Sequence, residues 1–382
     1  MLQKAARVRP VLIAAPVISY ADRFGFLPVV AGAAAGLRVP AGVIGTAVTA
    51  YFLLYGLAQP VIGRLSDRYG RVLVLRCALG GLALADLAAG LASHPAVLIA
   101  ARAVAGAASG ALLPTAMVYL GDTIGFRRRQ RAVSRVLAAA ALGAGVAMAA
   151  AGLLARWGSW RLPLLVVAGV APVILMRMRG LPEPEKATGS PAIWQVLRRN
   201  PALLVLFAFA LFEGAAMLGF FTFFAPALQA RGASTAVTGV VMGSYGVATT
   251  AGSWLIGRFP DRLVPRLPLI AGATAMVAGY LAAAVSQATV TILAASVLLG
   301  LAFALFHSAF QTWVTQLVPQ ARGLVTSLFV SCVFTGAAVG SAWAGGLAAR
   351  HAFGTIFLAA AVLAAAVGVT GSIARLRYQP GS

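Results

Sequence analysis

Twelve long apolar runs, separated by short loops, constrain this chain more than any other feature of its sequence. Of its 382 residues, 61% are hydrophobic and only 10% are charged, whereas a soluble domain carries roughly 25% charged residues. An apolar run of about 20 residues spans the hydrocarbon core of a bilayer as an α-helix. Composition and run length together predict an all-α membrane protein with twelve transmembrane helices.

The runs divide into two groups of six, joined by a polar connection that is rich in proline. We expect the halves at residues 1–180 and 201–382 and a cytoplasmic linker at 181–200. The sixth span is the shortest. The predicted spans are Val11–Gly36, Val43–Ile62, Val72–Ala92, Ala96–Tyr119, Val133–Ala155, Leu162–Met176, Ala202–Leu228, Ala236–Ile256, Leu267–Val285, Val290–Val318, Gly323–Ala349 and Ala352–Ile373.

Basic residues in the loops set the predicted orientation. Most of the 30 Lys and Arg residues fall on the side that holds both termini and the linker. The opposite loops hold Arg38, Arg156, Arg161, Arg231 and Arg350. Because loops rich in Lys and Arg stay inside, we expect a multi-pass protein of the cell membrane with both termini cytoplasmic. The net charge of +22 is dispersed over short loops, so it does not indicate nucleic-acid binding.

The loop between the second and third spans carries a nine-residue motif, Gly63-Arg64-Leu65-Ser66-Asp67-Arg68-Tyr69-Gly70-Arg71. We expect a tight turn, in which Gly63 and Gly70 allow a close approach and a positive φ. The pattern Gly-x-Leu-x-Asp-Arg-x-Gly-Arg resembles the signature loop of the major facilitator superfamily, with Val72 in place of a further basic residue. Part of the motif recurs in the second half as Gly257-Arg258-x-x-Asp261-Arg262.

This resemblance implies two pseudo-symmetric six-helix halves around a central cavity, and secondary transport by alternating access. It also implies that the motif loop gates the cytoplasmic side, through Gly63, Asp67, Arg68, Gly70 and Arg71. The expected partners are a small-molecule substrate, protons and the lipid bilayer, and the chain is expected to be a monomer. No nucleotide loop, metal cluster or hydrolytic triad is recognisable, so we expect neither an enzyme nor a cofactor.

Carboxylates inside the predicted spans are functional candidates, because lipid makes a charge costly. Asp22 lies near the middle of the first span and Glu213 near the middle of the seventh, so each half places one acid at equivalent depth. Desolvation favours the neutral form of such an acid, which suits reversible protonation. We predict proton coupling at Asp22 or Glu213. The alternative for either acid is a neutral carboxyl group that is hydrogen-bonded to a neighbouring helix.

Two arginines inside the spans have two interpretations each. Arg23 either neutralises an acid such as Asp22 or binds an anionic substrate group through two parallel hydrogen bonds. Arg102 begins the pattern Arg-x-x-x-Gly-x-x-x-Gly, which is similar to the superfamily's fourth-span motif. Its partner is either Asp86, at matching depth in the third span, or Asp22.

The other cavity candidates are Tyr51, Tyr55, Phe306, His307 and Phe310. The two tyrosines are one turn apart and either line a cavity or pack on the eleventh span. The two phenylalanines belong to an aromatic stripe on the tenth span, which is either a ligand wall or helix packing. The histidine beside this stripe is either a satisfied core residue or a proton carrier.

The function that we predict is proton-coupled export of small amphiphilic or drug-like compounds, for which Glu213 and the aromatic side chains are suited. The first alternative is proton-coupled transport of an organic anion or lysolipid on Arg23. It is favoured because Tyr20-Ala21-Asp22-Arg23 resembles the first span of facilitators for such substrates. A more remote alternative is a membrane sensor that binds without transporting. The fifth span reads Gly143-Ala144-Gly145-Val146-Ala147-Met148, without the proline of the drug antiporter motif.

Overall fold

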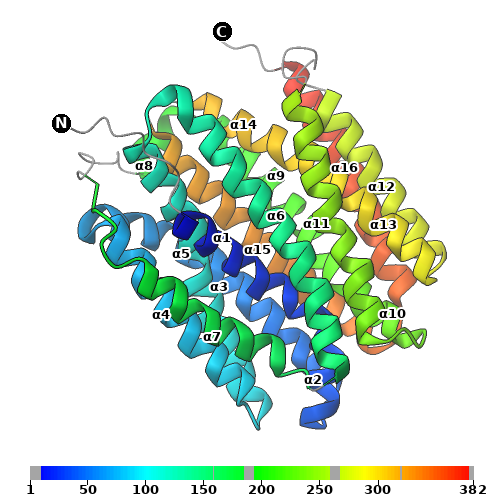
Figure 1. Ribbon diagram of the computed structural model, residues 1–382. Helices are drawn as coiled ribbons and strands as arrows, with labels where there is room; N and C mark the ends of the chain where they lie inside the picture. Colours follow the sequence, from blue (N-terminus) through cyan, green and yellow to red (C-terminus); the bar gives the residue numbers. More distant parts are fainter. Residues whose placement is uncertain (1–9, 158, 185–192, 259–266, 319–320, 378–382) are drawn as a thin grey trace.

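The computed structural model describes residues 10–157, 159–184, 193–258, 267–318 and 321–377, and these residues form a bundle of helices (Figure 1). Ten of its helical segments are long and apolar enough to cross a membrane. The shorter apolar helix α7 (Leu162–Arg177) and the 24-residue helix α11 (Thr235–Arg258) complete the set. The predicted all-α fold class with twelve membrane helices is therefore confirmed.

The first half of the chain follows the predicted spans with one interruption. Its elements are α1 (Pro10–Gly25), the 3-10 turn η1 (Leu27–Val29), α2 (Val30–Leu37), α3 (Ala41–Tyr69), α4 (Arg71–Gly90), α5 (Pro95–Thr123), α6 (Phe126–Trp157) and α7. The predicted first span is broken at η1, where Pro28 removes a backbone donor from the helix. The short sixth span is the 16-residue helix α7.

The second half contains two helices that pass through π-helical segments. Its elements are α8 (Ile193–Arg199), α9 (Ala202–Gly214), η2 (Ala215–Gly219), η3 (Phe220–Phe223), α10 (Phe224–Ala230), α11, α12 (Leu267–Val285), α13 (Thr289–Ala302), η5 (Phe303–His307), α14 (Ser308–Leu317), α15 (Arg322–Ala349) and α16 (Phe353–Arg377). The π-helical segments are η2 and η5. Helix α8 lies in the expected polar linker, and the division of the chain at 181–200 stays a prediction.

The two groups of six helices meet along two helix pairs. Helix α6 runs beside α11 (Figure 1), and α3 packs against α15. At the end of the bundle where α2 and α10 lie, Gln229 Nε2 donates to the Pro28 carbonyl oxygen at 2.7 Å. The hydroxyl groups of Thr49 and Ser341 lie 2.9 Å apart between α3 and α15. Polar contacts therefore join the two halves at this end.

The motif loop is tighter than the sequence suggested. Helix α3 continues through Gly63 and ends at Tyr69, so the expectation that Gly63 takes part in the turn with a positive φ is wrong. Gly70 alone makes the reversal, with a φ of +106° that suits a residue without a Cβ. A Cβ at Gly70 would also lie 2.7 Å from the carboxylate of Glu183. In the second copy of the motif, Asp261 and Arg262 lie outside the described residues.

The closest helix crossing in the second half gives a stability prediction. A Cβ on Gly336 of α15 would overlap the Leu211 carbonyl oxygen of α9, whereas a Cβ on Gly345 would meet nothing within 4 Å. Gly336→Ala should therefore force α9 and α15 apart, at a cost of about 1–3 kcal/mol, which is typical of overpacking. The melting temperature of the purified protein measures this. Gly345→Ala, on the same helix, is the matched control, and equal melting temperatures for the two variants would contradict the prediction.

Candidate functional site

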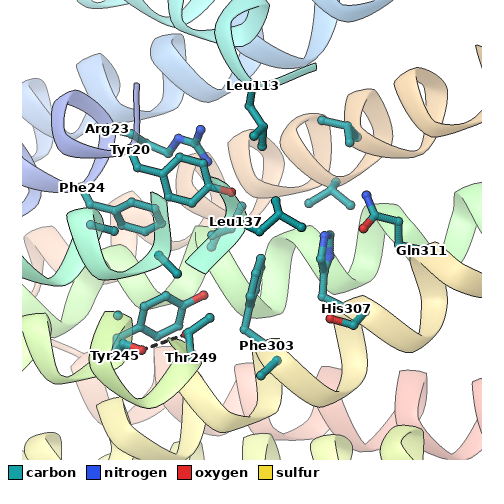
Figure 2. Close-up of a pocket in the computed structure, with 18 of the residues that line it drawn as sticks. Tyr20, Arg23, Phe24, Leu113, Leu137, Tyr245, Thr249, Phe303, His307 and Gln311 are labelled. Carbon is teal, nitrogen blue, oxygen red and sulfur yellow. Dashed lines mark hydrogen bonds between the residues drawn. The ribbon is translucent and has the colours of Figure 1, made fainter. Parts of the chain in front are cut away.

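A cavity of about 150 Å³ lies at the centre of the bundle, with side chains from both halves in its wall (Figure 2). Helices α1, α3, α5 and α6 contribute from the first half, and α11, η5, α14 and α15 contribute from the second. Three of the predicted cavity residues line it: Arg23, Tyr55 and His307. Four of them are not part of its wall: Tyr51, Arg102, Phe306 and Phe310.

Arg23 places a guanidinium group in the cavity wall among aromatic rings. Its Cζ atom lies 4.6 Å from the ring centre of Tyr20, 4.5 Å from that of Tyr55 and 4.7 Å from that of Phe334. The residue is 5% exposed. Within the described residues, its Nε and Nη2 atoms have no hydrogen-bond partner and it forms no ion pair with an acid. Cation–π contacts stabilise the charge, while the donors on Nε and Nη2 stay unused.

Arg102 contacts both of its candidate partners at once. Its Nη1 atom forms an ion pair with Asp22 Oδ1 and a second one, 2.8 Å long, with Asp86 Oδ1. Its Nη2 atom also donates to the Asp22 carbonyl oxygen at 3.3 Å. The two acidic side chains are completely buried, and that of Arg102 is 1% exposed. Because Arg102 is the ion-pair partner of Asp22, neutralisation of Asp22 does not explain Arg23.

This cluster of Asp22, Asp86 and Arg102 holds two acids against one guanidinium group. The Oδ2 atom of each acid has no hydrogen-bond partner in the part of the chain that the structure describes. Two ionised carboxylates in one buried site repel each other, and a proton on either of them removes the excess negative charge. The arrangement is therefore able to bind and release one proton while Arg102 stays paired.

The neighbours of Arg102 explain the arginine and glycine pattern of α5. The Cζ atom of Arg102 lies 4.6 Å from the ring centre of Tyr51, which places this tyrosine beside the cluster and outside the cavity wall. A Cβ on Gly106 would overlap the Tyr51 carbonyl oxygen. The glycine therefore lets the backbone of α3 approach α5 one turn below the buried charges.

Glu213 and His307 form a second buried pair, between α9 and η5. The Nδ1 atom of His307 lies 2.8 Å from Glu213 Oε1. The Glu213 side chain is 1% exposed, whereas that of His307 is 16% exposed and lines the cavity. The His307 ring is stacked on Phe303, with ring centres 4.5 Å apart and an interplanar angle of 12°. Glu213 thus contacts a residue that lines the cavity but does not line the cavity itself.

The π-helical segment η5 explains why the expected aromatic wall is not formed. Phe306 and Phe310 are fully buried, with ring centres 4.8 Å apart, and they face neighbouring helices. A Cβ on Gly272 of α12 would lie 2.8 Å from the Phe306 Cβ, which shows how closely this stripe packs. A π-helical turn rotates the residues after it relative to an α-helix. As a result, Phe303 and His307 face the cavity and the rest of the stripe does not.

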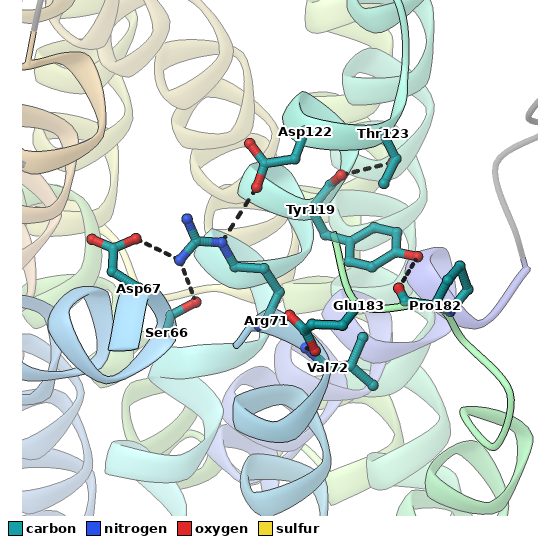
Figure 3. Close-up of polar contacts among 9 residues, drawn as sticks. All are labelled: Ser66, Asp67, Arg71, Val72, Tyr119, Asp122, Thr123, Pro182 and Glu183. Atoms are coloured by element: carbon teal, nitrogen blue, oxygen red, sulfur yellow. Dashed lines mark hydrogen bonds and ion pairs between the residues drawn. The ribbon is translucent and has the colours of Figure 1, made fainter. Parts of the chain in front are cut away.

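The motif turn between α3 and α4 is held by a network of polar contacts (Figure 3). The Nη1 atom of Arg71 donates to Asp67 Oδ1 at 2.5 Å and to Ser66 Oγ at 3.1 Å. Its Nε atom contacts Asp122 Oδ2 of α5 at 3.4 Å. The carboxylate of Glu183 accepts from the backbone N–H groups of Arg71 and Val72, at the positive end of the α4 dipole. Asp67 and Arg71, two of the predicted gate residues, are thus paired with each other.

Arg68 of this loop contacts an aromatic ring, and the loop borders a second cavity. The Cζ atom of Arg68 lies 5.3 Å from the ring centre of Tyr69. A second cavity, of about 550 Å³, borders the motif and is lined by Asp67, Arg68 and Arg71. Pro114 of α5 lines both this cavity and the central one. The central cavity therefore adjoins the motif end of the bundle.

Several side chains at the site were not found by sequence reasoning. Tyr20 lies three residues before Arg23, so a cation–π partner could have been expected from the spacing on one helix. Phe334 and Tyr245 come from α15 and α11 and reach the cavity only through the fold. Asp122 and Glu183 lie in polar loops or helix ends, where a carboxylate carries no signal of its own.

The fold and the central cavity define a polytopic membrane protein in which both helical halves line one cavity. The family model described as Major Facilitator Superfamily matches residues 12–289 and 215–382. The chain belongs to this superfamily.

Solved structures with the same fold cover nearly the whole chain. A nucleoside transporter, NupG, superposes with a TM-score of 0.77 at 15% identity, over 96% of this chain and 100% of that one. A bacterial homologue of the human lysosomal transporter Spinster, in an inward-facing and occupied conformation, gives 0.78 at 18% identity, over 97% and 98%. At such identities the likeness shows the fold alone.

Curated relatives match over shorter segments. A triacylglyceride transporter of Mycobacteroides abscessus is 36% identical over 129 residues, which is 32% of this chain and 25% of the relative. A puromycin resistance protein of Streptomyces alboniger is 34% identical over 143 residues, or 37% of this chain and 28% of the relative. The chain thus spans about a quarter of the length of these relatives.

Proposed function

We propose that the chain is a secondary transporter that works by alternating access and moves amphiphilic molecules that carry an acidic group. Arg23 carries this proposal. It is a permanent cation in the wall of the central cavity, it lies over aromatic rings, and among the described residues it forms no ion pair with an acid. An unpaired charge in a buried site is costly, and a carboxylate or phosphate group on a ligand would pair it through two parallel hydrogen bonds.

The sequence predicts export of small amphiphilic or drug-like compounds, to which Glu213 is suited, whereas the geometry supports the alternative of an acidic substrate on Arg23. Glu213 is 1% exposed, is bound to His307 and does not line the cavity. Arg23 lines the cavity, and its Nε and Nη2 atoms have no hydrogen-bond partner among the described residues. The rings of Tyr20, Tyr55 and Phe334 around it offer apolar surface for the remainder of an amphiphile. The name of the triacylglyceride transporter among the relatives agrees with an amphiphilic substrate class.

Alternating access is supported by the way in which the halves meet. Polar contacts join them where α2 and α10 lie, and the central cavity adjoins the motif end through Pro114. Glycines at the α6–α11 crossing bring the two backbones together, because a Cβ on Gly246 would lie 2.6 Å from the Ala141 carbonyl oxygen. Such a smooth contact suits rocking of one rigid half against the other around a fixed site.

Proton coupling is the second part of the proposal, and the cluster of Asp22, Asp86 and Arg102 supports it. Two buried acids share one guanidinium group, so one proton balances the site. Asp22 and Arg23 are adjacent in α1, so the proton site and the cavity wall are connected through neighbouring residues of one helix. Export is the direction that we propose, in line with the name of the puromycin resistance relative.

The proposed placement puts the protein in the cell membrane with both termini and the motif turn in the cytoplasm. The asymmetry of basic residues between the two sets of loops supports this orientation. In this orientation the central cavity adjoins the cytoplasmic side, and the contacts between η1 and α10 close the outer side.

The orientation is tested by cysteine labelling in a background without Cys77 and Cys332. Tyr69→Cys, at a position that is 52% exposed in the motif turn, should react with an impermeant maleimide only after the cells are opened. Ala288→Cys, in the loop before α13, should react in intact cells and serves as the reciprocal control. The reverse pattern of labelling would overturn the orientation.

The substrate class is tested with two permanently charged amphiphiles, hexanesulfonate and hexyltrimethylammonium. Arg23→Gln should weaken binding of the sulfonate at least tenfold, because the guanidinium group pairs the anion. Glu213→Gln should have a smaller effect on the same ligand. Dissociation constants from calorimetry on the purified protein measure both effects. Unchanged sulfonate affinity in Arg23→Gln, or tighter binding of the ammonium ligand by the wild-type protein, would show that the anion assignment is wrong.

Proton coupling is tested in proteoliposomes that carry a pH gradient. Asp22→Asn and Asp86→Asn each remove the excess negative charge of the cluster, so the cluster has no proton to exchange in either variant. Both should lose accumulation driven by the gradient while they retain exchange of labelled substrate for unlabelled substrate. Accumulation that persists in both variants would remove the cluster from the coupling mechanism, and loss of exchange would assign the acids to binding or folding instead.

A further inference from the structure

His307 is a second basic side chain in the wall of the central cavity, and it comes from the opposite half to Arg23. Arg23 lies on α1, whereas His307 ends the π-helical segment η5 (Figure 2). The cavity volume of about 150 Å³ is small. Drug-sized ligands occupy pockets of roughly 300–1,000 Å³, so this cavity accommodates a compact head group. Both side chains line this one cavity, from opposite halves of the chain.

The pairing of His307 with Glu213 fixes the role of each ring nitrogen. The Nδ1 atom faces Glu213 Oε1 at 2.8 Å, so the N–H of a neutral ring belongs on Nδ1 when the acid is ionised. The Nε2 atom then carries a lone pair, which repels an anion. When the ring is protonated, Nε2 becomes a charged donor while Nδ1 still donates to Glu213. An anion in the cavity therefore favours the protonated ring.

Few other charged or titratable groups face this histidine. Glu213 on α9 contacts it directly, and Tyr245 on α11 lies 6.1 Å from the Phe303 ring on which His307 is stacked. Helices α12, α13 and α14 contain no Asp, Glu, Lys or Arg. Helix α15 presents Phe329, with its ring centre 5.5 Å from that of His307. Across the cavity, α1 adds Arg23 and Tyr20.

We propose that the acidic head group of the substrate is bound between Arg23 and the protonated ring of His307, and that each bound anion is accompanied by one proton taken up on the His307–Glu213 pair. The chemical class is a compact acid on an apolar tail, such as a carboxylate, a sulfonate or a phosphate monoester. This inference rests on the proposed function, because it requires an anion at Arg23. It adds a contact from the second half, so the substrate itself connects the two halves.

Linkage between proton and anion gives this arrangement a measurable signature. If the anion binds only the protonated ring, then binding should weaken as the pH rises, by up to about tenfold per pH unit where the neutral ring predominates. By reciprocity, anion binding should take up close to one proton in the same pH range. Gln311, one turn after His307 on α14, also lines the cavity and is able to donate to the same head group without changing this pH dependence.

The test uses hexanesulfonate, because a sulfonate stays ionised across the relevant pH range and every proton taken up must come from the protein. Calorimetric titrations of the wild-type protein at pH 6 to 8.5, in buffers of different ionisation enthalpy, give both the dissociation constant and the number of protons taken up. We expect uptake of close to one proton and an affinity that falls with pH. His307→Gln should show no proton uptake and a nearly constant affinity, equal to that of the wild-type protein at high pH.

Two further variants separate the possible failures. His94→Gln changes an exposed histidine in the turn before α5 and should retain the wild-type proton uptake. Arg23→Gln should weaken binding at every pH, and an unchanged affinity in this variant would remove the proposed function together with this inference. If Arg23→Gln weakens binding while His307→Gln keeps the proton uptake and pH dependence of the wild-type protein, then the function stands and the role of His307 is wrong.

Discussion

A charge that is buried in a membrane bundle needs a partner, and the arrangement of the whole site follows from this constraint. The chain has only eight Asp and Glu residues, so partners are few. Two of the acids are bound to Arg102, and Glu213 is bound to His307. Arg23 is stabilised by aromatic rings, and within the described residues its Nε and Nη2 atoms have no hydrogen-bond partner. A ligand that brings its own negative charge completes the pairing.

Alternating access also requires that the two halves touch and can still move against each other. Small residues allow this contact. Glycines at the α6–α11 crossing let the backbones of the two halves touch, because a Cβ on them would overlap the facing helix. Inside the second half, Gly336 brings α15 equally close to α9. Within a half, Gly106 presses α5 against α3 beside the buried charges. The same residue type thus makes each half rigid and leaves the surface between the halves smooth, which suits rocking about a central site.

The fold was predictable from the sequence because span length and hydropathy are local properties, and the motif around Asp67 gave the family. The members of the charge cluster were also predictable, since acids and arginines in spans are rare. Their pairing was not. The positions of these residues along their predicted spans allowed Arg102 to bind Asp86 or Asp22. Only the three-dimensional arrangement shows that it binds both. Likewise, no periodicity reveals that η5 rotates Phe306 away from the cavity, or that α3 continues through Gly63.

Each half places one acid at equivalent depth, but the two acids have different partners. We propose that this difference gives the two halves different roles. Asp22 is bound to an arginine, which stays charged at every physiological pH, so any proton in that cluster must reside on an acid. Glu213 is bound to His307, and histidine is the residue type that most readily changes its charge at physiological pH. In the arrangement that we propose, the first half presents a constant cation to the cavity through Arg23, while the second half presents one only when the His307 ring is protonated. The anion is then held most firmly by the protonated form of the second half.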